Sequence, residues 1–379
     1  MRIGIDCRTI LNPSVGEGAG VGHYTYFLIK NLLQQDKRNE YVLFFDSSMK
    51  DLRPFRRDNA TPKYFPFSER RRYLPFAYSH VLTARAMQTE RLDLFHAPAN
   101  IIPLGYTGPA VVTIHDLAIY KNPSWFPRQI FSTKLLVPKS LTRAERIIAV
   151  SESTAEDLRE LFKVPSEKIS VIYEGVDVRP NPGEPQPDPR ERFNLPDDYL
   201  CFVGTLEPRK NLPRLIRAYA QALRQDVRFH NIPLVLAGKK GWQSAEVFAA
   251  LEQEGIQDNV HYLGYISKNE KLELIRHARA FVFPSLYEGF GLPVIEAMAL
   301  GTPVLTSDIS SLPEITGGAA YLVDPEEVNA IANGLARLAF DDNLRQRLSQ
   351  QGLEQARRFS WDKVALRTIA VYEKIRRAQ

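Results

Sequence analysis

The stretch 280–305 reads AFVFPSLYEGFGLPVIEAMALGTPVL. Its apolar run 280–283 predicts a buried strand, and EGFG at 288–291 predicts a tight loop. A helix is expected to start at Leu292, because the proline that follows is favoured in a first helical turn, and to end at Gly301. The next apolar run follows at once. A strand, a helix and a second strand in this order predict a parallel α/β sheet.

Two glutamates flank the start of this helix. Glu288 lies in the loop and Glu296 is expected in the first helical turn, so both belong to the carboxyl edge of the sheet, where open α/β folds bind ligands. Gly289 and Gly291 leave the backbone N–H groups of the helix start accessible to a phosphate. Glu296 can accept hydrogen bonds from sugar hydroxyls. The alternative is that Glu296 only complements the helix dipole and that Glu288 is a solvated turn residue.

A second strand, loop and helix junction is expected at 201–212, CFVGTLEPRKNL. Gly204 follows the strand, Arg209 and Lys210 lie in the loop, and Asn211 is expected as the helix N-cap. Because adjacent cations repel each other, their place beside a helix start favours a multiply charged anion such as a diphosphate as the ligand. A solvated surface pair is the alternative.

The rest of the chain extends the same alternation over two halves. The proline-rich segment 178–190, VRPNPGEPQPDPR, cannot form the interior of a helix or strand and predicts a domain linker. We expect two doubly wound α/β domains, at 1–177 and 178–360. The apolar stripe of the tail, 361–379, must pack on one of them, and periodicity does not decide which. The expected strands are 2–5, 41–45, 94–96, 111–115, 146–150, 200–203, 234–237, 260–263, 280–283 and 304–306.

The composition sets limits on the class of protein. A chain of 379 residues with 44% hydrophobic and 25% charged residues is a globular protein of about two domains. The net charge of +5 permits contact with an anionic partner but does not require one. Cys7 and Cys201 lie in apolar runs and predict buried, reduced thiols. Since no apolar run approaches the length of a membrane span, we expect a cytoplasmic protein without a secretion signal.

The first half carries a second set of candidate residues. Gly20 belongs to the glycine-rich loop VGEGAGVGHY, which fits neither the dinucleotide fingerprint nor the phosphate loop of ATPases. His115 and Asp116 end the expected strand 111–115; at most one of them can face a ligand, and a structural role for the histidine is the alternative. Hydrolase triads and protein-bound zinc are not expected, because their motifs do not occur in the sequence.

The segment from Lys50 to Arg91 is the most basic part of the chain. It holds ten Lys and Arg against four Asp and Glu, with aromatic residues and prolines between them. One interpretation is a solvated helical surface. The other is peripheral contact with an anionic membrane at its inner face, or capture of an acceptor that carries phosphates. No nucleic-acid partner is expected, because the aromatic residues are too scattered for a recognisable binding module.

The motifs FVGTLEPRKN, VHYLGYIS, FVFPSLY and EGFGLPVIEAMALGTPV, in this order after the glycine loop, resemble the retaining, metal-independent glycosyltransferases of family four. The resemblance covers nearly the whole chain and implies the GT-B architecture, in which two Rossmann-like domains face a cleft. TIHDL, AVSESTAEDL and YEGVD are most similar to bacterial mannosyltransferases of surface-polysaccharide assembly, which usually use GDP-mannose. The resemblance implies transfer of a hexose, with mannose as the first candidate, from a nucleotide-sugar to a glycan or lipid-linked acceptor, without a metal or cofactor.

The same resemblance implies roles for individual residues. Glu288 would contact the donor sugar, Glu296 the ribose, and Arg209 with Lys210 the diphosphate, while His115 would lie at the sugar. It also implies that the tail helix packs on the first domain. The further donor-site positions that it implies are Gly20, Gly204, Tyr265, Ile266, Gly289, Phe290, Gly291 and Leu292.

Three alternatives stay open at this point. A transferase of the same family that uses a UDP-sugar would share every motif named above. A sugar-nucleotide epimerase shares the architecture but needs further acid and base carboxylates at the anomeric carbon. A sugar-nucleotide sensor or scaffold without activity would tolerate loss of Glu288 and Arg209.

Overall fold

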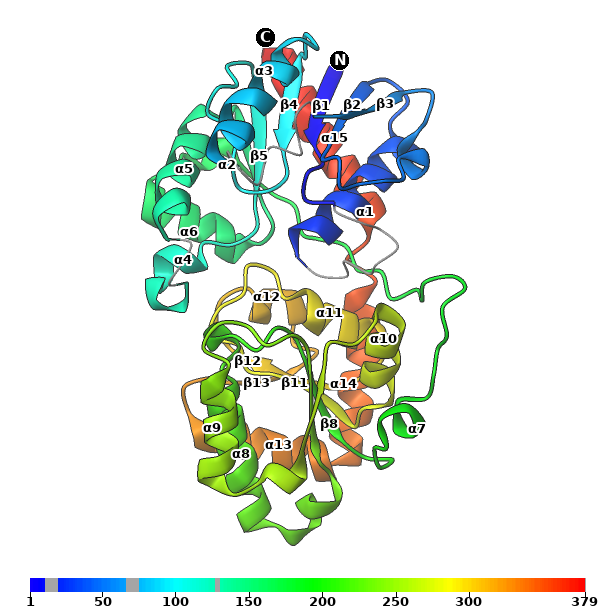
Figure 1. Ribbon diagram of the computed structural model, residues 1–379. Helices are drawn as coiled ribbons and strands as arrows, with labels where there is room; N and C mark the ends of the chain where they lie inside the picture. Colours follow the sequence, from blue (N-terminus) through cyan, green and yellow to red (C-terminus); the bar gives the residue numbers. More distant parts are fainter. Residues whose placement is uncertain (11–19, 66–74, 127–129, 379) are drawn as a thin grey trace. The chain divides into compact units, whose positions relative to one another are not determined.

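The computed structural model describes residues 1–10, 20–65, 75–126 and 130–378. The chain divides into two compact units, the first formed by Met1–Gly175 with Ser360–Gln379 and the second by Val176–Phe359 (Figure 1). Each unit is built on one parallel β-sheet with helices around it. The proline-rich segment belongs to the second unit, and its residues 178–188 form no helix or strand.

The sheet of the first unit has seven strands in the order β3-β2-β1-β4-β5-β6-β7. Every neighbouring pair is parallel, and the order reverses between β1 and β4, as in doubly wound folds. The strands are β1 (Arg2–Asp6), β2 (Glu40–Phe45), β3 (Ala60–Tyr64), β4 (Leu94–Ala97), β5 (Ala110–Ile114), β6 (Arg146–Ala149) and β7 (Ile169–Val171).

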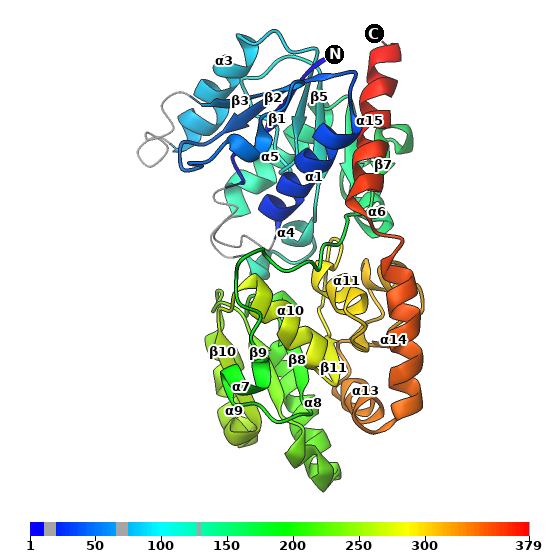
Figure 2. The same ribbon diagram turned by 90° about the vertical axis from the view of Figure 1, so that its right-hand side faces the viewer.

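The last helix of the chain, α15 (Trp361–Ala378), packs against α1 (Val21–Gln35), as Figures 1 and 2 both show. The indole of Trp361 stacks on Phe27 with ring centroids 5.4 Å apart, and the Tyr372 hydroxyl lies 2.6 Å from His96 Nδ1. The other helices of this unit are η2 (Arg53–Phe55), α2 (Pro75–Ala77), η4 (Tyr78–Leu82), α3 (Thr83–Gln88), α4 (Ala118–Lys121), η5 (Pro123–Trp125), α5 (Ile130–Arg143), α6 (Glu152–Phe162) and η6 (Ser166–Lys168).

The second unit repeats the plan with six parallel strands in the order β10-β9-β8-β11-β12-β13. They are β8 (Leu200–Val203), β9 (Leu234–Ala237), β10 (Val260–Gly264), β11 (Ala280–Phe283), β12 (Val304–Ser307) and β13 (Tyr321–Val323). The helices are α7 (Pro189–Phe193), η7 (Pro208–Lys210), α8 (Leu212–Gln225), η8 (Val227–Asn231), α9 (Ala245–Glu254), η9 (Gln257–Asn259), α10 (Lys268–His277), α11 (Leu292–Ala299), α12 (Leu312–Thr316), α13 (Val328–Phe340) and α14 (Asp342–Ala356).

The strand order determines where a ligand can bind in the second unit. β8 and β11 are neighbours, with Leu200 opposite Ala280, although they are far apart in the sequence. The connections from these strands lead to opposite sides of the sheet, so the loops that follow them open a crevice at the carboxyl edge. The loops that carry Arg209, Lys210 and Glu288 therefore meet there. The two predicted doubly wound sheets are confirmed.

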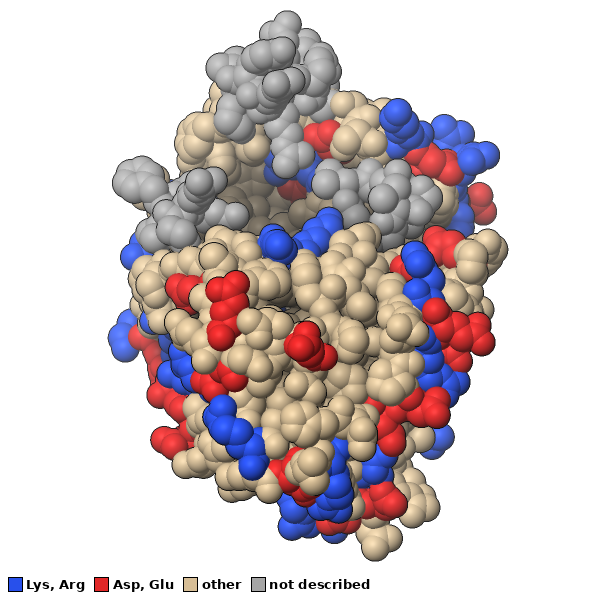
Figure 3. Space-filling model, turned by 60° about the horizontal axis from the view of Figure 1, so that its bottom comes forward, with Lys and Arg blue, Asp and Glu red and all other residues tan. Residues whose placement is uncertain are grey.

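Two of the expectations from the sequence concern the cysteines and the hydropathy of the helices. Cys7 and Cys201 are buried and free, as expected. Within the described ranges, no helix combines the length and the hydropathy that crossing a bilayer requires. The face of the molecule drawn in Figure 3 intersperses basic and acidic side chains.

Candidate active site

A buried ion cluster occupies the crevice between β8 and β11. Glu288, in the loop after β11, accepts a hydrogen bond from Arg209 Nη1 at 2.7 Å on one carboxylate oxygen and from Lys210 Nζ at 2.5 Å on the other. Ser285 Oγ donates to the second oxygen at 2.6 Å. Glu288 is only 6% exposed, so the interpretation as a solvated turn residue is wrong.

The cluster keeps Glu288 ionised. Burial by itself would raise the pKa of this carboxyl, because the charged form loses water contacts. The positive charges of Arg209 and Lys210, with the hydrogen bonds from Lys210 and Ser285, outweigh burial and lower the pKa of Glu288 to about 2. Burial and the charge of Arg209 lower the pKa of Lys210, while Glu288 and Glu207 act in the opposite direction, so the fixed charge that follows from these shifts is the negative charge of Glu288.

Arg209 is held by a second carboxylate that sequence reasoning missed. Its Nε lies 2.7 Å from Glu207 Oε1, and its Nη1 also donates to the carbonyl of Tyr287 at 3.0 Å. The guanidinium thus lies between Glu207 and Glu288, so Arg209 and Lys210 are not a solvated surface pair. The only available signal was a glutamate two residues before the arginine in EPRKN.

The side chain of Asn211 differs from its expected role. Its backbone is left-handed, with φ of 62°, and its side chain accepts no capping hydrogen bond from α8. The amide nitrogen instead donates to the carbonyl oxygens of Pro284 and Pro325, at 3.1 and 2.6 Å. Asn211 is thus the N-cap residue of α8, as predicted, and its carbonyl accepts the N–H of Leu215, but its side chain ties the loop after β8 to the chain after β11 and β13 instead of capping the helix.

The loop 288–291 is fixed from the chain after β12. Ser310 Oγ accepts the backbone N–H of Glu288 at 3.1 Å, and Ser311 Oγ donates to the carbonyl oxygens of Glu288 and Phe290, both at 2.9 Å. Gly291 then adopts a left-handed φ of 102° directly before Leu292. No side chain caps α11 in the described part of the chain, but Pro293 has no N–H, and the N–H groups of Val294 and Ile295 donate to the Gly291 carbonyl. The start of α11 therefore offers an anion the Leu292 N–H and the positive end of the helix dipole.

Glu296 lies deeper in α11 than expected, in the fifth position of the helix, and is 2% exposed. Both of its carboxylate oxygens accept hydrogen bonds from Lys271 Nζ of α10, at 2.7 and 2.8 Å. Glu296 therefore does more than complement the helix dipole, and its prediction for the first turn is wrong. Lys271 is a second residue that the sequence did not reveal.

The remaining positions of the second unit lie at the same edge of the sheet. Tyr265 and Ile266 connect β10 to α10; Tyr265 is 55% exposed with Lys239 Nζ 4.6 Å from its ring centroid, and Ile266 is buried. Gly204 follows β8. A Cβ placed on Gly238 would lie 1.9 Å from the carbonyl oxygen of Gly204. The chain after β9 therefore comes so close to Gly204 that only a glycine fits at position 238.

His115 and Gly20 lie in the first unit. His115 comes one residue after the end of β5 and places its ring nitrogens 3.0 Å from Glu174 Oε1 and 2.8 Å from the carbonyl oxygen of Pro98. Gly20, with φ of 74°, precedes α1 and accepts the N–H of Tyr24, whose ring meets the His115 ring edge-on at 4.6 Å. The glycines at 16 and 18 lie outside the described residues.

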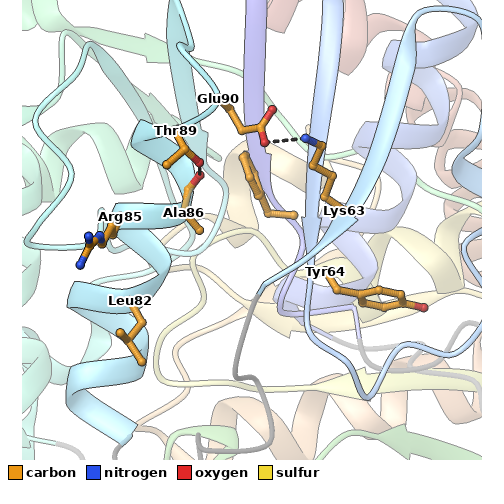
Figure 4. A pocket seen from close by; sticks show the side chains of 8 residues that line it. Lys63, Tyr64, Leu82, Arg85, Ala86, Thr89 and Glu90 are labelled. Carbon is orange, nitrogen blue, oxygen red and sulfur yellow. Dashed lines mark hydrogen bonds and ion pairs between the residues drawn. The ribbon is translucent and has the colours of Figure 1, made fainter.

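The basic segment of the first unit borders a pocket of about 410 Å³ (Figure 4). Lys63 and Glu90, two of its lining residues, form an ion pair with 2.5 Å between Lys63 Nζ and Glu90 Oε1. Its other lining residues are Phe44, Tyr64, Leu82, Arg85, Ala86 and Thr89. The arginines at 70–72 lie outside the described residues. No group of three His, Cys, Asp or Glu able to hold a metal ion occurs in the parts of the chain that the structure describes.

Comparisons with known proteins show two family matches and a relative similar over nearly the whole chain. The family described as glycosyl transferases group 1 matches residues 185–355, and glycosyltransferase family 4 matches residues 18–179. The O-antigen chain mannosyltransferase B of Escherichia coli is 32% identical over 367 residues, which are 93% of this chain and 96% of that protein.

Two solved structures share the fold over their full length. The sucrose-phosphate synthase of Thermosynechococcus elongatus superposes with a TM-score of 0.75 at 21% identity, covering 100% of both chains. HepE of Anabaena, in complex with UDP and glucose, superposes with a TM-score of 0.72 at 19% identity, covering 99% of this chain and 100% of that one.

Proposed function

Since the chain belongs to the group 1, family 4 glycosyltransferases, we propose that it transfers mannose from GDP-mannose to a glycan or lipid-linked glycan, with retention of the anomeric configuration and without a metal ion. The observation that carries the proposal is the pairing of Glu288 with Arg209 and Lys210 beside the uncapped start of α11. The similarity to an O-antigen mannosyltransferase supports mannose as the sugar.

The charge of the site supports departure of a diphosphate. Breaking the bond between the anomeric carbon and the phosphate oxygen leaves negative charge on the departing nucleotide. Arg209, Lys210 and the positive end of the α11 dipole can stabilise this charge in a buried site, where such interactions are strong. Two protein cations thereby supply what a divalent metal supplies in other transferases.

Glu288 contributes a second, separate effect. Its ionised carboxylate lies against both cations, so a bound diphosphate shares them with Glu288. Because Glu288 and the diphosphate contact the same two cations, the carboxylate lies beside the donor sugar. There it can accept hydrogen bonds from sugar hydroxyls and stabilise the positive charge that develops on the sugar ring. Because the pKa of Glu288 is about 2, this group is a fixed anion and not a general acid.

The nucleoside is proposed to lie along α10 and α11. Glu296 accepts hydrogen bonds from the ribose hydroxyls, and Lys271 sets the orientation of this carboxylate through its two contacts. The exposed ring of Tyr265, with Ile266 beside it, offers a surface for the base. The second unit is thus proposed to hold the donor nucleotide, and the first unit to bind the acceptor.

Retention is proposed to occur within one step on one face of the sugar. The acceptor hydroxyl attacks the anomeric carbon from the side on which the diphosphate leaves, and its proton passes to the departing phosphate oxygen. The carboxylate of Glu288 already accepts hydrogen bonds from three donors, so Glu288 does not act as a nucleophile in this proposal.

A second candidate is a UDP-sugar donor, because the similar fold of HepE was solved with UDP and glucose. The test of both is a transfer assay with GDP-mannose, UDP-glucose and UDP-N-acetylglucosamine, mannose-containing oligosaccharide acceptors and excess chelator. Acceptor-dependent release of GDP and an α-mannosidic product identified by NMR are expected. Transfer from a UDP-sugar alone, or activity abolished by chelation, would overturn the corresponding part of the proposal.

We further propose that the basic segment 50–91 contacts anionic lipid. In its described part, the apolar side chains of Phe76 and Val81 are 57% and 55% exposed, and Arg56 and Arg57 are exposed as well. Co-sedimentation with phosphatidylglycerol vesicles at low salt is expected, and none with phosphatidylcholine. Replacing Phe76 and Val81 by serine should weaken it. Absence of binding to either vesicle would refute this contact.

A further inference from the structure

His115 joins several loops of the first unit through its backbone and its ring. Its backbone N–H donates to Asn100 Oδ1 at 2.8 Å, and its Nε2 lies 2.8 Å from the carbonyl oxygen of Pro98. Its Nδ1 lies 3.0 Å from Oε1 of Glu174, the residue before Gly175 at the end of the unit's first segment. The histidine thereby connects three loops, which follow β4, β5 and β7.

Both ring nitrogens of His115 meet groups that only accept hydrogen bonds. A carbonyl oxygen has no proton to give, and an ionised carboxylate has none either. A neutral imidazole carries one N–H, so it could satisfy only one of the two contacts. The imidazolium carries two and satisfies both. The geometry therefore selects the protonated ring, although His115 is almost completely buried.

We propose that Glu174 is a positioning residue that keeps His115 a doubly donating imidazolium and, through it, fixes the loop of Pro98 and Asn100 at the acceptor side. Glu174 itself contacts no substrate in this account. Neither Glu174 nor the protonation state of His115 follows from the sequence motifs. The part of the proposal that concerns catalysis rests on the transferase function proposed above, whereas the protonation state does not.

The groups around the ring agree with this assignment. Burial by itself would lower the pKa of His115, but the hydrogen bond and charge of Glu174, the carbonyl of Pro98 and the charge of Asp116 outweigh it and raise the pKa. His96, packed nearby, stays neutral, because burial and the positive charge of His115 lower its pKa to about 3. Tyr24 meets the ring edge-on as a neutral phenol, since burial raises its pKa.

An unusual backbone conformation supports a positioning role. Asn100 has a left-handed φ of 62°, which costs free energy for a residue other than glycine. Its side chain accepts the His115 N–H, and its own N–H donates to the carbonyl of Thr113 at 3.0 Å. The loop after β4 thus depends on hydrogen bonds to the end of β5, and loss of the His115 contacts should release it.

The experiment is an NMR titration of the seven histidine rings in the full chain, with His115→Gln used to assign the resonance of His115. The resonance of His115 is expected to titrate above 6.5, and in Glu174→Gln the midpoint should fall by about 1 to 3 pH units. Glu174→Asp, which keeps the charge, should restore most of the shift.

A matched control uses the same substitution at another histidine and glutamate pair. Glu273 lies 3.7 Å from His277 on α10 of the second unit, and their side chains are 14% and 31% exposed, so Glu273→Gln should leave both the His115 titration and the activity unchanged. If His115 acts as proposed, kcat/KM falls as pH rises through its pKa, and in Glu174→Gln this fall begins at lower pH. A residue with only a structural role would lower stability without moving the profile.

Two results would overturn the proposal. One is a wild-type His115 resonance that titrates at or below 6.5, and the other is an unchanged midpoint in a folded Glu174→Gln. Should Glu174→Gln fail to fold, the wild-type titration and Glu174→Asp decide the question. The titration needs no donor, so failure of mannosyl transfer from GDP-mannose would refute the proposed function and leave this inference standing.

Discussion

Lys210 Nζ lies 2.5 Å from Glu288 Oε1, and both side chains are buried in the crevice between β8 and β11. The two residues are 78 positions apart in the sequence and meet because strand order places their loops side by side. Burying an ion pair costs desolvation free energy. The attraction between the charges offsets this cost only when every buried charge has a partner. Removal of a single member should therefore affect both folding and binding.

The first prediction concerns the stability of this cluster. In Glu288→Gln, the buried charges of Arg209 and Lys210 lose their common counter-ion and keep only Glu207. The free energy of unfolding should fall by roughly 3 kcal/mol, as found when one partner of a buried pair is removed. Urea unfolding followed by circular dichroism measures it. Glu273→Gln, at a partly exposed pair on α10, is the control; equal stabilities of the two variants would contradict the prediction.

The second prediction separates the shape of Arg209 from its charge. Its guanidinium contacts Glu207 and Glu288 at once, each at 2.7 Å, which a single lysine ammonium cannot reproduce. In Arg209→Lys, kcat/KM should fall by about 10² to 10³, comparable to the loss of one donor to a developing oxyanion. Steady-state kinetics tests it, and activity within a factor of about three of wild type would count against it.

The third prediction tests whether Lys271 acts through Glu296. In Lys271→Met, Glu296 loses both hydrogen bonds that orient it. We expect the donor KM to rise by about tenfold or more with a smaller change in kcat, because a hydrogen bond to a charged group contributes about 1.5 to 3 kcal/mol. Lys271→Arg should recover part of the affinity. A fall in kcat at unchanged KM would show another role.

The fourth prediction follows from two pKa values that are lower in the folded chain than in the unfolded one. The pKa of His96 is lowered from 6.5 to about 3, and the pKa of Glu288 is lowered from 4.5 to about 2. On acidification the unfolded chain takes up protons first, so stability is lost as pH falls from 6.5 toward 3 for His96 and from 4.5 toward 2 for Glu288. Unfolding by urea across this range should give a continuous decrease. A flat profile below 4.5 would contradict it.

The fifth prediction concerns the attachment of α15 to the first unit. A Cβ on Gly175 would lie 2.6 Å from the backbone nitrogen of Trp361, where α15 begins. Gly175→Ala should therefore push α15 away and destabilise the first unit by about 1 to 3 kcal/mol. Hydrogen exchange should show faster exchange in α15 than in the helices of the second unit. Unchanged protection of α15 would mean that the backbone yields at no cost.

The central strands of both sheets could be predicted because they are fully buried and therefore apolar throughout. Of the edge strands, β10 could be predicted from its apolar residues, whereas β3, β7 and β13 could not. β3 reads ATPKY, with a proline and a lysine that edge strands tolerate, and it is only partly buried. β7 and β13, with three residues each, are too short to show a period. Pattern reasoning detects burial on both faces and misses strands that lie at the margin.

The site shows the same division. Placing Arg209, Lys210 and Glu288 at one edge of a sheet required only strand polarity. The contact of Lys271 with Glu296 joins α10 to α11, which no local spacing reveals. The side-chain partners of Asn211 were missed for the same reason, since its amide donates to carbonyls 73 and 114 residues away.

The most direct test of the central claim is calorimetric binding of GDP, GDP-mannose, UDP and UDP-glucose to the full chain in excess chelator. We predict that GDP and GDP-mannose bind without metal, that UDP and UDP-glucose bind far more weakly, and that Arg209→Ala loses the diphosphate contribution. Preference for the uracil nucleotides, or binding that appears only when a divalent metal is restored, would contradict the account.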